Sequence, residues 1–151
     1  MPLANTKTSQ SAKAHVRHTF TASAEDVFDA WLDADVLARW MFHPNIRQEE
    51  VINLSLDGRP GGTFRFHVRR GDEKLEYYGT YYDVNRPTQL VFSWISAKDH
   101  KKTLVSVTIQ ENNTGCELNL THELGACAED YIHFVEMRWR AEFAILSELV
   151  N

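Results

Sequence analysis

Two alternating strands followed by a long amphipathic helix constrain the fold of this chain most strongly. We expect the strands at residues 104–109 and 116–122, with a turn at residues 112–115 between them. From about residue 128 to residue 150, apolar side chains recur at helical spacing. A helix of about 22 residues is roughly 33 Å long and can lie across a whole sheet. A curved antiparallel sheet closing on such a helix encloses an apolar space, so ligand binding is the first function to consider.

The preceding sequence predicts more strands and two short helices. Alternating or turn-bounded apolar runs indicate strands at residues 14–20, 49–56, 63–69, 75–84 and 90–94. Ser23 precedes a carboxylate at Asp26, which is the signature of a capped helix start. Asp33 or Asp35 could cap a second short helix, which Pro44 ends. The connections are too short for parallel crossovers, so we expect an antiparallel sheet and an α+β fold.

Length and composition indicate one folded domain. The chain has 151 residues, of which 43% are hydrophobic and 25% charged. A chain of this size buries about two-thirds of its unfolded surface, so it needs no disulfide or metal. Residues 1–13 are polar and lack apolar periodicity, which predicts a flexible N-terminal tail before a domain at 14–151. Without an apolar leader or a membrane-length apolar stretch, we expect a cytoplasmic protein that does not bind membranes.

Charge and cysteine usage argue against nucleic-acid and metal binding. The net charge is −5, and no basic stripe opposes it. Cys116 and Cys127 are not part of a C-x-x-C motif, and the spacing of His122, Cys127 and His133 matches no standard metal site. The glycine-rich residues 58–62 lead into a strand and lack the lysine of a phosphate loop. We therefore expect no metal and no cofactor.

Several segments, in order and spacing, resemble a known family. They are residues 20–31, 37–40, 61–66, 78–81, 86–94 and 115–122. Over about residues 14–150 the chain resembles the activator-of-heat-shock-protein-90-ATPase-like family of the START-like (SRPBCC) helix-grip superfamily. The resemblance implies a curved antiparallel sheet around a long C-terminal helix, two short helices after the first strand, and a pocket between helix and sheet. It implies no single reaction, because superfamily members bind lipids, hormones or polyketides and only some catalyse.

The eukaryotic activators of this family carry an additional N-terminal chaperone-binding domain, and we expect no room for one in 151 residues. Members usually have a Gly-Trp pair in the terminal helix. This chain has Arg138-Trp139 instead, with Glu142 four residues after Arg138. A helical wheel places Glu142 inside the sheet-facing apolar arc and Arg138 on its flank. These two residues either orient a ligand in the pocket or form an i,i+4 ion pair at its rim, worth ~0.3 kcal/mol.

Further polar and aromatic residues are candidates for the pocket. His122 follows the inward Leu118 and Leu120, and could contact a ligand or act as an acid or base. We favour a hydrogen-bonded histidine near the sheet edge. The aromatic candidates for the cavity wall, which could equally fill the core, include Trp40, Phe64, Phe66, Tyr77, Tyr81, Phe92, Trp94 and Phe134. The carboxylates of Glu49 and Glu50 are most simply solvated.

We expect the protein to bind a small apolar or amphipathic ligand between helix and sheet, without assuming catalysis. An amphipathic ligand would place an anionic head near Arg138. Its apolar body would lie against Phe64, Phe66, Phe92 and Trp94. One alternative is a cyclase- or hydrolase-type enzyme using Arg138, Glu142 and His122. Another is a protein-interaction module related to chaperone activators, and a homodimer remains open.

Overall fold

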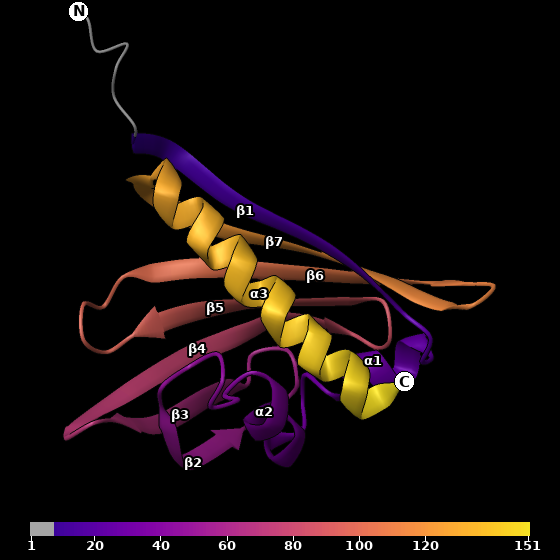
Figure 1. The fold of residues 1–151 in the computed structure, drawn as a ribbon, viewed down its shortest axis with the longest axis horizontal. Helices are drawn as coiled ribbons and strands as arrows, with labels where there is room; N and C mark the ends of the chain where they lie inside the picture. The colour runs from indigo at the N-terminus through magenta and orange to yellow at the C-terminus, as the bar shows by residue number, and fades with distance from the viewer. Residues whose placement is uncertain (1–7) are drawn as a thin grey trace, which may run out of the picture.

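The computed structural model describes residues 8–151 and has the expected α+β architecture, in which one long helix crosses a single sheet (Figure 1). The elements in chain order are β1 (Thr8–Phe20), α1 (Ala24–Asp29), α2 (Ala34–Trp40), β2 (Glu50–Leu56), β3 (Thr63–Arg70), β4 (Glu73–Asn85), β5 (Gln89–Ser96), β6 (Lys102–Asn112), β7 (Gly115–Ala128) and α3 (Glu129–Val150). Each predicted strand and helix is present, with bounds that differ by a few residues at most, apart from the start of β1 and the end of β7.

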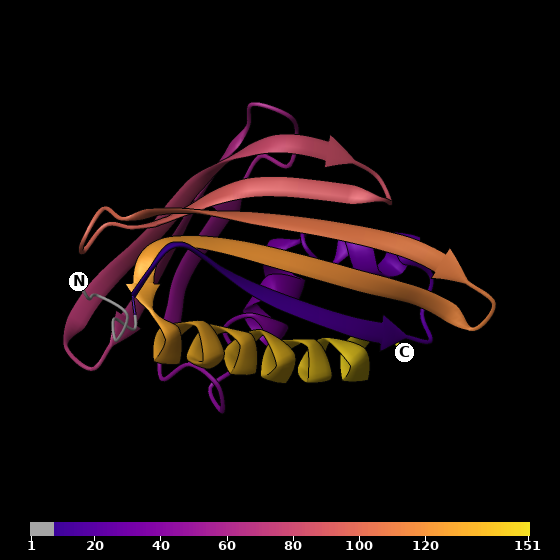
Figure 2. The ribbon, with the colours of Figure 1, turned by 90° about the horizontal axis from the view of Figure 1, so that it is seen from above.

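The sheet is antiparallel and has seven strands in the order β1-β7-β6-β5-β4-β3-β2. It curves around α3, which runs along its inner face (Figure 2). The residues of α3 that are buried are Val135, Trp139, Glu142, Phe143 and Leu146. This set follows the predicted apolar stripe and includes the glutamate that the wheel places within it. The helix-grip fold class is therefore confirmed.

The first strand begins earlier than the sequence predicts. Residues 8–13, which we expected in the tail, belong to β1, and Thr8 pairs with Ala128 of β7. Because β7 extends six residues beyond His122, its backbone offers hydrogen-bonding partners to the start of β1. Ala12 is buried as a result. The rest of the predicted tail, residues 1–7, lies outside the described residues.

Both short helices begin at the expected capping residues. The Ser23 hydroxyl accepts a hydrogen bond from the Asp26 amide at 3.1 Å. Of the two aspartates considered for the second helix, Asp33 is the cap, and its Oδ1 accepts from the Asp35 and Val36 amides at 3.0 and 3.3 Å. The helix α2 contacts both α3 and β2, so the chain that follows it is brought close to the inner face of the sheet.

Aromatic side chains fill most of the space between α3 and the sheet. Phe64 and Phe66 lie with their ring centroids 4.6 Å apart, and Trp31 packs against Trp139 at 5.7 Å. Gly79 is required beside Phe64, because a Cβ there would stand 2.0 Å from the Ser93 carbonyl oxygen and 2.7 Å from the Phe64 ring. The space between α3 and the sheet is therefore mostly packed core and not an open ligand tunnel. No helix within residues 8–151 is long and apolar enough to cross a membrane.

Candidate functional site

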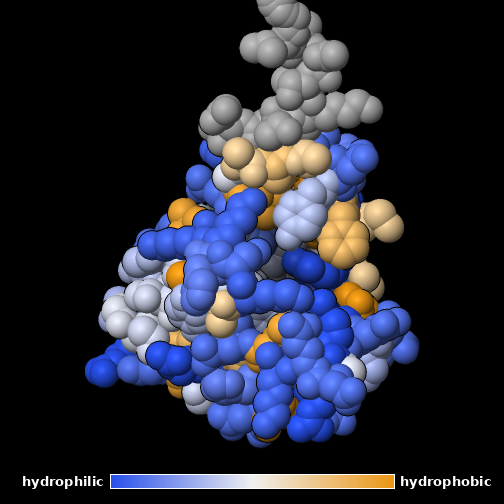
Figure 3. Space-filling model, turned by 90° about the vertical axis from the view of Figure 1, so that its left-hand side faces the viewer, coloured by the Kyte–Doolittle hydropathy of each residue, from blue (hydrophilic) through white to orange (hydrophobic). Residues whose placement is uncertain are grey.

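A cavity of about 300 Å³ remains between the first turns of α3 and the adjoining ends of β4, β5, β6 and β7. Its lining residues are Arg47, Arg70, Tyr77, Trp94, Ser96, Asp99, Lys101, Thr103, His122, Leu124, Tyr131 and Arg138. Four of these side chains are cationic and one is acidic. Figure 3, which views the molecule from this end, shows mostly hydrophilic side chains around a hollow, with smaller hydrophobic patches among them. The cavity is therefore suited to an anionic group.

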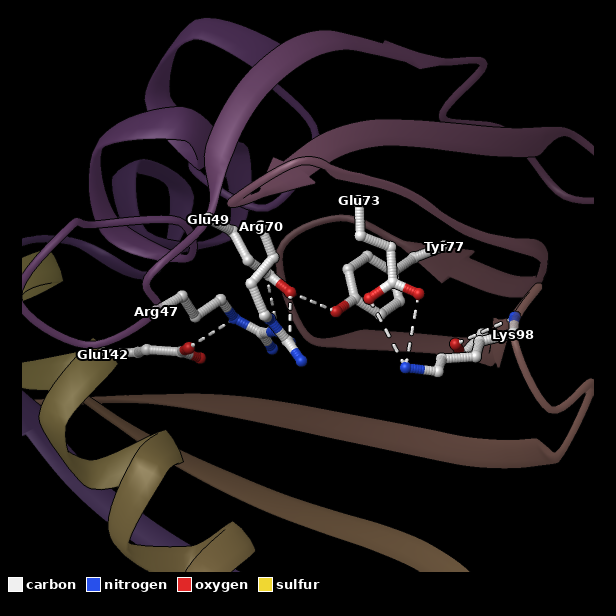
Figure 4. A network of polar contacts seen from close by, with 8 residues as sticks. Arg47, Glu49, Arg70, Glu73, Tyr77, Lys98 and Glu142 are labelled. Atoms are coloured by element: carbon white, nitrogen blue, oxygen red, sulfur yellow. Dashed lines mark hydrogen bonds and ion pairs between the residues drawn. The ribbon is translucent and has the colours of Figure 1, made fainter.

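Buried ion pairs lie beneath the cavity (Figure 4). Arg47 donates through Nε to Glu142 Oε2 at 3.2 Å, and its Nη1 lies 3.5 Å from Glu49 Oε1. Glu49 Oε2 accepts from Arg70 Nη2 at 2.7 Å and from the Tyr77 hydroxyl at 2.5 Å. The side chains of Arg47, Glu49 and Glu142 are 8%, 1% and 0% exposed. Arg47, Glu49 and Glu142 therefore hold charge in the protein interior. These three residues, together with Arg70 and Tyr77, are called the ion network below.

Arg47 is held by aromatic rings as well as by carboxylates. Its guanidinium carbon lies 5.3 Å from the ring centroid of Phe42, 5.6 Å from that of Tyr77 and 5.8 Å from that of Trp94. Although burial opposes its charge, the carboxylates of Glu142 and Glu49 raise the pKa of Arg47 above its ordinary value. Arg47 therefore stays protonated, and removing both carboxylates would leave a costly buried charge.

The buried carboxylate of Glu142 behaves differently. Burial raises the pKa of Glu142 to about 7, although Arg47 and Arg138 both favour its charged form. Its Oε1 has no hydrogen-bond partner among the described residues. Glu142 thus lies close to the point where its carboxyl group is half protonated at neutral pH.

Arg138 is the cation without an acidic partner. No carboxylate in the described part of the chain lies within ion-pair distance of Arg138. Of the two alternatives, the i,i+4 ion pair is wrong, because Glu142 pairs with Arg47. Burial, and then repulsion from Arg47, lowers the pKa of Arg138. Its Nε is buried with no acceptor among residues 8–151, and its guanidinium carbon lies 5.6 Å from the Phe134 ring centroid. A positive charge without a counter-charge in the described chain therefore borders the cavity.

His122 is the hydrogen-bonded histidine that the sequence favours. Trp139 donates through Nε1 to His122 Nδ1 at 3.1 Å, which places the ring proton on Nε2. That nitrogen lies 2.9 Å from Thr103 Oγ1, whose hydroxyl donates to the Trp94 carbonyl oxygen at 3.0 Å. Burial, and then the charges of Arg138 and Arg47, lowers the pKa of His122 to about 3. His122 is thus neutral at physiological pH with both ring nitrogens engaged.

The predicted cavity residues divide into two groups. Those that line the cavity are Tyr77, Trp94, His122 and Arg138. Those that do not border it are Trp40, Phe64, Phe66, Tyr81, Phe92, Phe134 and Glu142. Most of the second group are buried in the core or beneath Arg47, whereas Phe134 is 53% exposed on α3. The predicted position for an apolar ligand body is therefore occupied by side chains.

Sequence reasoning missed Arg47, Arg70 and Lys101 as cavity residues, and it placed Glu49 on a solvated face. That last assignment is wrong, because Glu49 is 6% exposed and accepts hydrogen bonds from Arg70 and Tyr77. One signal pointed to the ion network: a glutamate in the apolar arc of α3 requires a cationic partner. The chain has 16 lysines and arginines, and spacing alone does not select one. Within residues 8–151, no three His, Cys, Asp or Glu side chains lie together so that they could hold a metal ion.

The curved sheet gripping a long C-terminal helix, with a cavity between them, defines a START-like helix-grip protein. The family model described as "Activator of Hsp90 ATPase homolog 1-like protein" matches residues 21–151, and the chain belongs to this family. The predicted resemblance is thereby confirmed. A search among curated proteins finds no match to this sequence.

Solved structures from several bacteria share the fold. A protein from Rhizobium leguminosarum superposes with a TM-score of 0.77 at 18% identity, over 96% of this chain and 98% of that one. A protein from Cytophaga hutchinsonii gives a TM-score of 0.76 at 19% identity, covering 91% and 92% of the two chains. A third, from Rhizobium loti, gives 0.75 at 21% identity, covering 91% and 96%. At these identities the likeness establishes the fold and does not extend to ligands.

Proposed function

We propose that this protein binds a small amphipathic ligand in the cavity, with the anionic head of the ligand on Arg138. The observation that carries the proposal is the half-buried guanidinium of Arg138, which borders the cavity without an acidic partner in the described chain. A buried cation without a counter-charge is costly, and a carboxylate or phosphate arriving there would form charge-assisted hydrogen bonds. Lys101 at the same cavity adds to the attraction.

The volume limits the ligand. A cavity of about 300 Å³ is at the lower end for small-molecule sites. It corresponds to roughly ten water-sized volumes, which suits a head group with a short apolar portion. Trp94, Tyr77 and Leu124 provide apolar surface at the cavity, in place of the interior phenylalanines expected from the sequence.

Neither His122 nor Tyr77 is set up for acid–base catalysis. His122 has no free ring nitrogen to act as a base, since Trp139 and Thr103 engage both. Burial raises the pKa of Tyr77 to about 12, and its hydroxyl donates to Glu49. Both groups keep the same proton across the physiological range, so neither supplies an acid or a base for turnover.

The test is calorimetric titration of hexanoate into the wild type and into Arg138→Met. Removing the guanidinium should weaken binding by ~1.5–3 kcal/mol, the range for a hydrogen bond to a charged group. The matched control is Arg140→Met, because Arg140 is exposed on the same helix and does not line the cavity. Equal affinities for Arg138→Met and the wild type, or no binding by the wild type at millimolar concentrations, would reject the proposal.

A further inference from the structure

An exposed aromatic pair lies beside the cavity at the start of α3. Tyr131 and Phe134 are 44% and 53% exposed, and their rings stack with centroids 6.1 Å apart and planes 22° apart. Tyr131 also lines the cavity. On the other flank, the Arg138 guanidinium carbon lies 5.6 Å from the Phe134 ring centroid. These two residues, the Tyr131–Phe134 platform, therefore form an apolar surface that continues directly from the cationic cavity.

The inner end of the cavity cannot take an apolar chain. Tyr77 and Trp94 stack at 4.9 Å, and Arg47 sits against both rings. A chain pushed past them would separate Arg47 from Glu49 and Glu142. Those charges are almost fully buried, so leaving them unpaired costs several kcal/mol, more than a short alkyl chain returns.

The rest of the cavity margin is polar. Arg70, Asp99 and Lys101 come from the ends of β3 and the β5–β6 connection, and they are exposed. In Figure 3 mostly hydrophilic side chains surround the hollow, and hydrophobic ones are visible above it and to its right. An apolar chain leaving the cavity therefore finds apolar contact on the α3 side alone among these walls.

We propose that the ligand is a medium-chain carboxylate or a similar single-chain anion, bound with its head in the cavity and its chain lying outward on the Tyr131–Phe134 platform. This rests on the proposed function, because the head is held by Arg138. It reverses the usual expectation for an enclosed helix–sheet pocket: the charge is inside and the chain is outside. The platform explains why two aromatic residues beside a charged cavity stay exposed.

The experiment measures affinity along a series of straight-chain carboxylates from acetate to decanoate, kept below their micelle concentrations. For the wild type, affinity should rise roughly two- to fourfold for each methylene that reaches the platform. Phe134→Ala and Tyr131→Ala should flatten this rise for the longer members. The readout is the slope of affinity against chain length, because Tyr131 also lines the cavity and Phe134 contacts Arg138. Leu149→Ala is the control, because Leu149 is 41% exposed at the far end of the same helix.

The outcomes separate this inference from the proposed function. If the short carboxylates bind through Arg138 but affinity does not rise with chain length, the platform proposal fails and the proposed function stands. An unchanged rise in both alanine variants, matching Leu149→Ala, would also overturn it. Sedimentation that shows self-association lost in Phe134→Ala would assign the platform to contacts between protein copies instead. If no carboxylate binds at all, both proposals fail together.

Discussion

Replacing Glu142 with glutamine should remove a specific part of the pH dependence of stability. Glu142 is fully buried, and Arg47, Glu49 and Arg138 are the charged groups that act on it. Burial raises the pKa of Glu142 to about 7 from an ordinary value of 4.5. The folded protein therefore keeps a proton on this carboxyl group at pH values where the unfolded chain has lost it.

The sign and size follow from proton linkage. Where the folded state binds more protons, stability falls as pH rises, so the Glu142 contribution is fully present below about pH 4.5 and is lost by about pH 7. A difference of about 2.5 pKa units corresponds to ~3 kcal/mol over the whole interval. His122 acts in the opposite direction: its lowered pKa makes stability rise with pH until about pH 6.5. The pH dependence of wild-type stability therefore contains the contributions of both groups. The difference in stability between the wild type and Glu142→Gln gives the contribution of Glu142.

The assay is urea unfolding of the wild type, Glu142→Gln and Glu148→Gln at steps from about pH 5 to about pH 8. The stability of the wild type relative to Glu142→Gln should fall by ~2–3 kcal/mol across this interval. Glu148 is exposed on the same helix, so Glu148→Gln should track the wild type. Parallel profiles for the wild type and Glu142→Gln, within ~0.5 kcal/mol, would refute the reasoning and indicate an ordinary carboxylate at position 142.

Three further predictions concern stability. Trp139→Ala should lower the free energy of unfolding by ~3–5 kcal/mol, because it leaves a cavity in place of the buried indole and leaves His122 Nδ1 without its donor. A loss below ~1 kcal/mol in urea unfolding would contradict this. Gly79→Ala should cost more than ~2 kcal/mol in the same assay, because a Cβ would collide with the Ser93 carbonyl oxygen; a neutral effect would show that β4 can shift. Deleting residues 1–13 should lower the melting temperature by more than ~4 °C in a calorimetric scan, because the deletion removes strand pairing with β7. A smaller drop would show that this pairing contributes little to stability.

Much of the fold follows from local sequence patterns, because this sheet buries one face. Residues 63–70 read alternately apolar and polar, and their burial alternates in step. The capping residues Ser23 and Asp33 mark helix starts by a chemistry that acts within three residues. The start of β1 escaped prediction because residues 8–13 carry little apolar signal. These residues form a strand because they pair with the backbone of β7, far along the chain, and a local sequence pattern does not indicate such a pairing.

The site was less predictable because it depends on long-range pairing of charges. The helix period shows that Glu142 faces the core, but it does not show that Arg47, 95 residues earlier, reaches it. Glu49 looked solvated because a carboxylate usually is, and its burial depends on Arg47, Arg70 and Tyr77 together. Most of the aromatic candidates do not line the cavity, for a related reason: the same sequence pattern fits a core and a cavity wall, and only packing distinguishes them.

The ion network is better understood as a device for placing charge than as a source of stability. Buried ion pairs seldom stabilise a protein more than apolar residues of the same volume would, since desolvation offsets their attraction. Here Glu142 and Arg138 lie one helical turn apart on α3, and Arg47 takes Glu142. That pairing leaves Arg138 facing the cavity without a counter-charge in the described chain. The ion network also closes the inner end of the cavity and separates it from the aromatic core. The cavity of this chain is therefore short and lined by several cationic side chains, and the exposed rings of Tyr131 and Phe134 lie beside it.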